Sequence, residues 1–171
     1  MLIVVNPLIL SVRGCLYVEL GESMPTAASP DLNDYRLDDQ IGPLLRRAYQ
    51  RACSNLSARL DGHRVTPIQY STLVRLWEYG AVSQNRLGRL LEIKSGNMHG
   101  VVRRLQEREL VATAQDPDHR GRVLLKLSRT GLQLVKSSIP LSRQATADTL
   151  APLSSSEQKQ LFHLMRLLID D

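Results

Sequence analysis

A short stretch near the middle of the chain sets polar side chains between regularly spaced apolar ones. The apolar members follow the helical i, i+3, i+4, i+7 pattern, at Met98, Val101, Val102 and Leu105. The polar members fall at other phases of the same predicted helix, at Ser95, Asn97, His99, Arg103 and Arg104. Since the apolar face must pack inward, the amide, imidazole and guanidinium groups face outward. They suit the base edges and phosphates of a DNA major groove.

Two glycines interrupt this polar face. Gly96 and Gly100 have no side chain and lower the helix propensity. One explanation is close approach of the helix backbone to DNA, and the other is local relaxation. On the first explanation Gly100 joins the predicted DNA contacts.

A second basic group is expected at the tip of a β-hairpin. The Asp, Pro and Gly residues within 116–121 predict a turn. Arg120 lies at its tip and Arg122 follows, and an arginine on a two-stranded ribbon can enter a narrow minor groove. Asp118 could hold the Arg120 guanidinium by a charge-assisted hydrogen bond. The alternative is an ordinary turn with a surface ion pair, which contributes little to stability.

The charge distribution agrees with a phosphate-binding surface in this region. The 171 residues carry a net charge of +5, and residues 83–126 alone hold 9 basic and 5 acidic side chains. Such a basic patch is typical of nucleic-acid binding, although a chance surplus on a solvated helix face would look the same. The segment has no Phe, Tyr or Trp on which unpaired bases could stack, so duplex DNA is favoured over RNA or single strands.

The elements around the predicted recognition helix have clear start and stop signals. Thr66 to Gln69 form a capping box with Pro67 at the first helical position, and Gly80 ends that helix. Ser83 caps a short helix that a brief turn separates from the recognition helix, which predicts a helix-turn-helix. Strands over 111–115 and 122–128 complete the hairpin.

Leucine-rich helices are expected at both ends of this unit. Leu supplies 30 residues while aromatics are 4% of the chain, which favours helices. The first spans 35–60; Ser128 begins another, which Pro140 should kink or interrupt. A capping box from Ser154 to Glu157 precedes the last, whose apolar face is Leu161, Leu164, Met165 and Leu168. The predicted fold is mainly α with a small β-hairpin.

Other classes of function lack their motifs. The sequence contains no Gly-rich phosphate loop, H-E-x-x-H, C-x-x-C or G-x-S-x-G, so we expect neither an enzyme nor a cofactor. The two cysteines, Cys15 and Cys53, exclude a disulfide framework. Four scattered histidines lack metal-ligand spacing. No apolar run reaches the roughly 18 residues of a membrane span, so no membrane partner is expected.

Residues 1–34 are predicted to be a flexible extension outside the folded core. Their apolar stretch is broken by Asn6 and Pro7 and lacks a basic start, which makes it a poor signal peptide. Met24 is a plausible alternative start. We therefore expect a cytoplasmic protein.

Residues 66–131, from TPIQYSTLVRLWEYG to DPDHRGRVLLKLSRTG, resemble the MarR-type transcriptional regulators. The most specific part is the acidic-basic wing followed by LSRTG, and LSSSEQKQLFHLMRLL is similar to the family's final helix. The resemblance covers residues 38–169. Two departures stand out: glycines at 96 and 100 replace polar or basic residues common in the recognition helix, and Lys94 stands where an acidic or hydroxyl cap is usual.

The resemblance implies a winged helix-turn-helix with intertwined N- and C-terminal dimerisation helices. Residues 35–171 would form one domain, with the winged module at 66–128 and the dimerisation helices at 35–60 and 129–170. It implies a homodimer on a pseudo-palindromic operator in double-stranded DNA. Asn97, His99, Arg103 and Arg104 would lie on the recognition helix and Arg120 on the wing tip.

Members of the family commonly bind small aromatic acids, which lower their affinity for DNA. An aromatic carboxylate suits a cleft with aromatic surface and a cation. The candidates are Arg46, Tyr49, His63, Tyr70 and Trp77. The alternative is that Tyr70 and Trp77 belong to the core and that Arg46 is solvated.

The expected function is a sequence-specific DNA-binding transcriptional regulator, a repressor released by a small aromatic acid. One alternative is a redox-responsive regulator of the same fold that uses Cys53, although a buried structural thiol is favoured there. Another is a helical interaction protein that does not bind DNA.

Overall fold

The computed structural model describes residues 35–119 and 121–169. The chain divides into two units, Met1–Arg36 and Leu37–Asp171, and the elements below belong to the second. The predicted extension, residues 1–34, lies outside the described residues, as does Arg120 at the hairpin tip.

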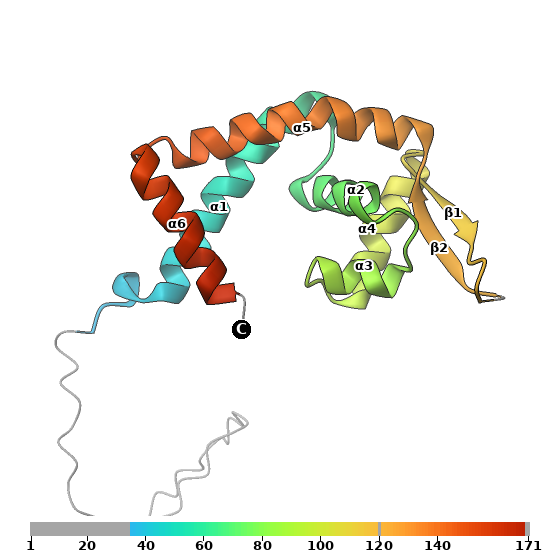
Figure 1. Cartoon of the computed structure of the whole chain (residues 1–171), viewed down its shortest axis with the longest axis horizontal. Helices are drawn as coiled ribbons and strands as arrows, with labels where there is room; N and C mark the ends of the chain where they lie inside the picture. Colours follow the sequence, from blue (N-terminus) through green and yellow to red (C-terminus); the bar gives the residue numbers. More distant parts are fainter. Residues whose placement is uncertain (1–34, 120, 170–171) are drawn as a thin grey trace, which may run out of the picture. The chain divides into compact units, whose positions relative to one another are not determined.

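Helices and one antiparallel hairpin make up the second unit (Figure 1). The predicted fold, mainly α with a small β-hairpin, is confirmed. The helices are α1 (Ile41–Leu60), α2 (Pro67–Tyr79), α3 (Gln84–Leu90), α4 (Ser95–Glu107), α5 (Arg129–Leu150) and α6 (Ser155–Ile169). The strands are β1 (Val111–Gln115) and β2 (Val123–Leu127), and short 3₁₀ turns span Leu37–Asp39 and Asp61–His63.

The helix-turn-helix begins at the predicted caps. Before α2, the backbone N–H of Gln69 donates to Thr66 Oγ1 at 3.4 Å, and the Gln69 side chain accepts from the Thr66 N–H at 2.9 Å. Before α3, Ser83 Oγ accepts from the Arg86 N–H at 3.3 Å. Each bond satisfies a donor that the first helical turn leaves without a partner, so the starts of α2 and α3 are fixed locally.

The core lies between α2, α3, α4, the hairpin and the first half of α5. Side chains from each helix are completely buried there, among them Leu73, Leu87, Met98, Leu105 and Val135. Full burial of such a side chain contributes about 1.5–3 kcal/mol. Two members, Met98 and Leu105, come from α4, so the rotation of α4 about its own axis is set by the core.

The hairpin is fastened to the helices at its root. Strand β1 pairs with β2 from Val111 opposite Leu127 to Gln115 opposite Val123. Val82, in the loop between α2 and α3, exchanges two backbone hydrogen bonds with Leu125, at 3.0 and 2.8 Å. The hairpin therefore extends the helix-turn-helix as a wing.

Helix α5 is continuous from Arg129 to Leu150 with Pro140 inside it. The predicted interruption at Pro140 is therefore wrong. Proline removes one backbone donor, and the carbonyl it leaves without a partner belongs to Lys136. Both residues are exposed, so water can satisfy that carbonyl at little cost.

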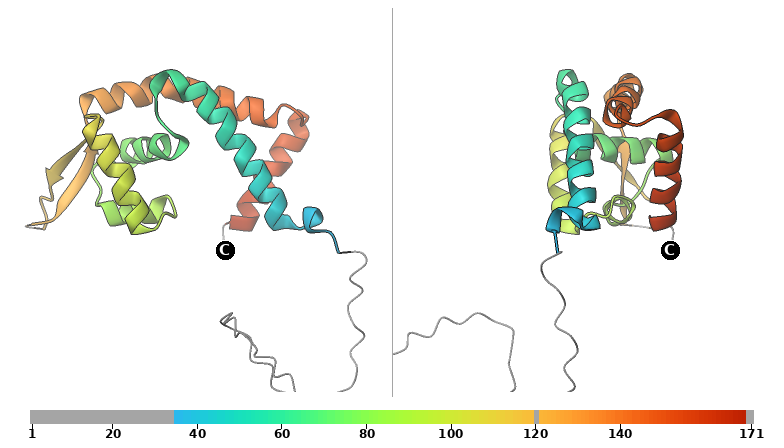
Figure 2. Two further views of the ribbon diagram at one scale, coloured as in Figure 1. Left: turned by 180° about the vertical axis from the view of Figure 1, so that it is seen from behind. Right: turned by 90° about the vertical axis from the view of Figure 1, so that its left-hand side faces the viewer.

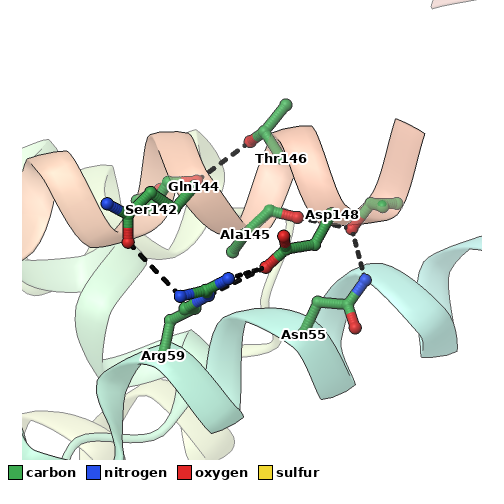
Figure 3. A network of polar contacts seen from close by, with 8 residues as sticks. Asn55, Arg59, Ser142, Gln144, Ala145, Thr146 and Asp148 are labelled. Carbon is green, nitrogen blue, oxygen red and sulfur yellow. Dashed lines mark hydrogen bonds and ion pairs between the residues drawn. The ribbon is translucent and has the colours of Figure 1, made fainter. Parts of the chain in front are cut away.

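The first helix starts later than predicted, at Ile41 rather than residue 35, and packs along α5. Polar side chains join the two (Figure 3): Asn55 donates to Thr149 Oγ1 at 2.9 Å, and Arg59 contacts Asp148 Oδ2 through both Nε and one terminal nitrogen, at 2.8 and 2.7 Å. These contacts hold α1 against the second half of α5.

Helices α1 and α6 extend from the second half of α5, away from the hairpin (Figure 2). Their apolar side chains find little cover within the chain. On α6, Leu164 is 50% exposed and Leu168 is 63% exposed, and on α1, Ile41 is 63% exposed. The apolar face predicted for the last helix is thus present, with Leu161, Leu164 and Leu168 exposed and Met165 half-buried.

Candidate nucleic-acid interface

Helix α4 presents the predicted polar residues to solvent. Its apolar residues Met98, Val101, Val102 and Leu105 are all buried, at 5% exposure or less. Ser95, Asn97, His99, Arg103 and Arg104 are exposed, and Gly100 is half-buried. Because the buried face is fixed by the core, the outward direction of the polar face follows from packing rather than from the polar residues themselves.

The start of α4 is polar and open. Lys94 precedes the helix without a side-chain capping bond, so the first N–H groups of α4 are available to an anion. A Cβ on Gly96 would meet nothing within 4 Å, and one on Gly100 only the end of the Arg104 side chain at 3.9 Å. Packing inside the chain therefore does not require glycine at either position.

Two arginines of α4 differ in their surroundings. Arg103 Nε lies 3.5 Å from the Glu107 carboxylate, one turn along the same exposed face. In the described part of the chain no carboxylate lies within ion-pair distance of Arg104. Of the two guanidinium groups, Arg104 is the one not engaged by an acid.

Further polar residues border α4 that sequence reasoning missed. A surface hollow of about 450 Å³ between α3 and the start of α4 is lined by Gln84, Asn85, Arg89 and Lys94 together with Ser95. The turn beside it is tight, because a Cβ on Gly88 would lie 3.1 Å from the Ile93 carbonyl oxygen. Leu87 marks the buried side of α3, so the residues on the opposite side of this helix face outward. That spacing is the sequence pattern that could have identified them.

The nearly buried carboxylate of Asp116 holds the turn of the wing in place. The Asp116 side chain is only 8% exposed and lies 3.5 Å from Arg122 Nε and 3.7 Å from His119 Nδ1. It also accepts a hydrogen bond from the Asp118 N–H at 3.0 Å. Arg122 in turn donates to Ser83 Oγ at 3.4 Å, which links the wing to the start of α3. The predicted Asp118–Arg120 bond lies outside the described residues.

A cavity of about 340 Å³ lies among α1, α2, α5 and α6. Its lining is apolar or hydroxyl-bearing and includes no charged residue. Except for Tyr49, its lining residues were not among the predicted ligand residues; they include the hydroxyl-bearing and aromatic residues Ser71, Ser142, Thr146, Thr149 and Phe162. Thr146 and Thr149 donate their hydroxyls to backbone carbonyls of α5 (Figure 3).

The structure does not bring the five predicted ligand residues together. Tyr49 lines the cavity, whereas Tyr70 is buried in the core. Arg46 lies at the start of α1 beside Arg47. Trp77 is 49% exposed at the end of α2. The backbone oxygen of His63 accepts a hydrogen bond from Arg108.

Cys53 is half-buried on the cavity wall rather than fully buried. It lies one helical turn from Tyr49, and a side-chain hydrogen bond with Cys53 raises the pKa of the Tyr49 hydroxyl above its ordinary value. Electrostatic interaction with Cys53 and partial burial raise this pKa further.

None of the described helices is long and apolar enough to cross a bilayer.

Known proteins share both the sequence pattern and the fold. The profile of the MarR family matches residues 65–120. The HTH-type transcriptional repressor NicR of Pseudomonas putida is 32% identical over 149 residues, which are 87% of this chain and 94% of NicR.

Two solved structures are similar over most of their length. A probable transcriptional regulator from Pseudomonas aeruginosa has 41% identity and a TM-score of 0.74, over 78% of this chain and 99% of its own. BpsR of Bordetella bronchiseptica, whose DNA binding is regulated by 6-hydroxynicotinic acid, has 32% identity and a TM-score of 0.74, over 80% and 98%. These matches cover far more of the chain than the winged module alone. The chain therefore belongs to the MarR family of winged helix-turn-helix transcriptional regulators.

Proposed function

We propose that the chain is a dimeric repressor, without catalytic activity, that binds a pseudo-palindromic operator and leaves it when a small aromatic acid binds. The observation that carries the DNA-binding part is the exposed polar face of α4 above its fully buried apolar face. The related proteins are bacterial. Because bacterial operator DNA lies in the cytoplasm, the protein acts there.

Each subunit inserts α4 into a major groove. Asn97, His99 and Arg103 read base edges, since amide, imidazole and guanidinium groups match the donors and acceptors presented there. Arg104, Arg89 and Lys94 contact phosphates and supply most of the affinity. The open space beside Gly100 lets the helix backbone approach the DNA closely.

The wing contacts the flanking minor groove through Arg120. The Asp116–Arg122–Ser83 contacts support this role because they fix the root of the turn against α3. An arginine there meets the strongest negative potential of narrow-groove DNA.

Dimerisation buries the exposed apolar faces of α1 and α6. Ile41, Leu164 and Leu168 are each at least half exposed in a single subunit, and contiguous apolar surface of this kind marks a protein interface. A two-fold axis through these helices places the two α4 helices about 34–36 Å apart, one turn of DNA.

The effector is an aromatic acid of the size of one ring. NicR is a repressor, and BpsR responds to 6-hydroxynicotinic acid, which supports the same ligand class here. The cavity lies between the helices assigned to dimerisation and the winged module, and it contains Tyr49, one of the five predicted ligand residues.

The test is operator binding by an Asn97→Ala/His99→Ala variant, after genomic footprinting has located the operator. Both side chains are exposed, so the fold and the dimer should persist, while the preference for operator over unrelated duplex should fall by roughly 1–3 kcal/mol per lost base contact. Gln133→Ala, exposed on α5, is the control. A double variant that keeps full preference would overturn the DNA-reading role of α4.

A further inference from the structure

A second hollow lies at the root of the wing, where the end of α2, the end of β2 and the start of α5 meet. Its apolar floor includes Trp77 and Leu132, and Lys126 and Arg129 line it as well. It shares no residue with the cavity among α1, α2, α5 and α6.

Trp77 lines this hollow and is exposed to solvent. Trp77 is 49% exposed, at the end of α2 where Glu78 and Tyr79 are exposed as well. Gly80, which also lines the hollow, has a φ of +70°, and a Cβ there would meet nothing within 4 Å, so the hollow is open beside Gly80. An exposed indole face binds flat aromatic rings by stacking.

Two cations complete the hollow. Lys126 and Arg129 are exposed, and in the described ranges neither has an ion-pair or hydrogen-bond partner on a side chain. The planar guanidinium of an arginine matches a carboxylate in a bidentate geometry. An apolar floor beside two unengaged cations is complementary to an anion with a flat apolar body.

From this complementarity we infer that the hollow is a binding site for an aromatic carboxylate, with its ring on Trp77 and its charge on Arg129 and Lys126. The inference rests on the aromatic-acid effector of the proposed function and adds a second recognition site for that class of acid, apart from the cavity that contains Tyr49. The cavity among α1, α2, α5 and α6 has no charged residue in its lining, so a carboxylate bound there meets no cationic side chain among the lining residues. Ligand at the hollow touches α2, β2 and α5 together, at the point from which the wing extends.

Trp77 is the only tryptophan of the chain, so its fluorescence reports on the hollow directly. The experiment titrates the full-length protein, without DNA, with benzoate and with its neutral isostere benzamide. Benzoate should quench the emission saturably, and benzamide should not. Lys126→Gln/Arg129→Gln should weaken benzoate binding by about tenfold, as loss of two exposed ionic contacts implies. Lys136→Gln/Arg143→Gln removes the same charge from exposed positions elsewhere on α5 and should bind as the parent does.

A third variant separates the two sites. Ala52→Phe places a ring in the cavity among α1, α2, α5 and α6 and should leave quenching by benzoate unchanged. Equal quenching by benzamide, unchanged affinity in the Lys126/Arg129 variant, or loss of quenching in Ala52→Phe would each overturn the inference. None of these results touches DNA binding, whereas a failure of aromatic acids to release the operator would contradict the effector part of the proposed function even if the hollow binds benzoate.

Discussion

Gly131, in the first turn of α5, lies directly against the backbone carbonyl of Leu110, and a Cβ on Gly131 would overlap the Leu110 oxygen. The same oxygen accepts the Ser128 N–H at 3.1 Å. Ser128 Oγ in turn accepts the Gly131 N–H at 2.9 Å. The segment between α4 and β1 is thereby joined to the start of α5 with no room for a side chain, which explains the glycine that closes the LSRTG motif.

Gly131→Ala should therefore lower the free energy of unfolding by about 1–3 kcal/mol, the usual cost of forcing extra atoms into a packed site. The measurement is urea denaturation. The control is Gly96→Ala on α4, where the added Cβ meets open space and the higher helix propensity of alanine should leave stability equal or slightly raised. Equal stability of the two variants would contradict the close contact.

The sequence predicts those parts of the fold that depend on residues close together in the chain. The Thr66 and Ser83 caps and the apolar spacing of α4 involve residues within about two turns of each other, so spacing alone locates them. The cavity joins Tyr49 to Phe162, and the second hollow joins Trp77 to Lys126, from distant parts of the chain. No local pattern encodes such contacts. For this reason only Tyr49, of the five residues predicted to bind ligand, lines the cavity in the structure.

The brace around Asp116 should matter for DNA affinity more than for stability. Asp116→Ala removes the partner of Arg122 and the acceptor of the Asp118 N–H, so the wing loses its fixed angle to α3. We expect operator affinity to fall by about 1–2 kcal/mol, since a wing held loosely must be ordered on binding. Binding is measured by fluorescence anisotropy.

The sign of this effect is informative. Removal of a negative charge alone should tighten DNA binding. Asp118→Ala removes the same charge from an exposed neighbour and should behave in that way. If Asp116→Ala also tightens binding, the carboxylate does not position the wing.

The roles of Arg103 and Arg104 should be distinguishable from the salt dependence of DNA binding by variants of each. Arg104→Gln removes the phosphate contact that we propose and should reduce the slope of log affinity against log salt by about 1 while leaving operator preference unchanged. Arg103→Gln should lower the preference itself. Glu107→Gln frees Arg103 from its ion pair at 3.5 Å and is the companion variant. Identical slopes and preferences in both arginine variants would refute the division of roles.

The start of α6 should weaken in acid through Glu157. Ser154 donates its hydroxyl and its backbone N–H to the Glu157 carboxylate, at 2.6 and 2.7 Å, and the hydroxyl bond, followed by the backbone bond, lowers the pKa of Glu157 below its ordinary value near 4.5. Since the folded pKa is the lower one, the capping box stabilises α6 fully above pH 4.5. This contribution is lost as the pH falls through the folded pKa.

Ser154→Ala removes the hydroxyl bond, which is the larger cause, and keeps the backbone bond. The pKa of Glu157 should therefore move part of the way back to its ordinary value, and the acid-dependent fraying of α6 should begin at higher pH. A carbon-detected NMR titration of the Glu157 carboxyl measures the pKa of Glu157 and the pH at which the start of α6 frays. Ser155→Ala, exposed in the same turn, leaves both bonds to Glu157 in place and should not shift the titration. A Glu157 titration curve that is the same in Ser154→Ala and the parent would show that the hydroxyl does not hold the charge at this helix start.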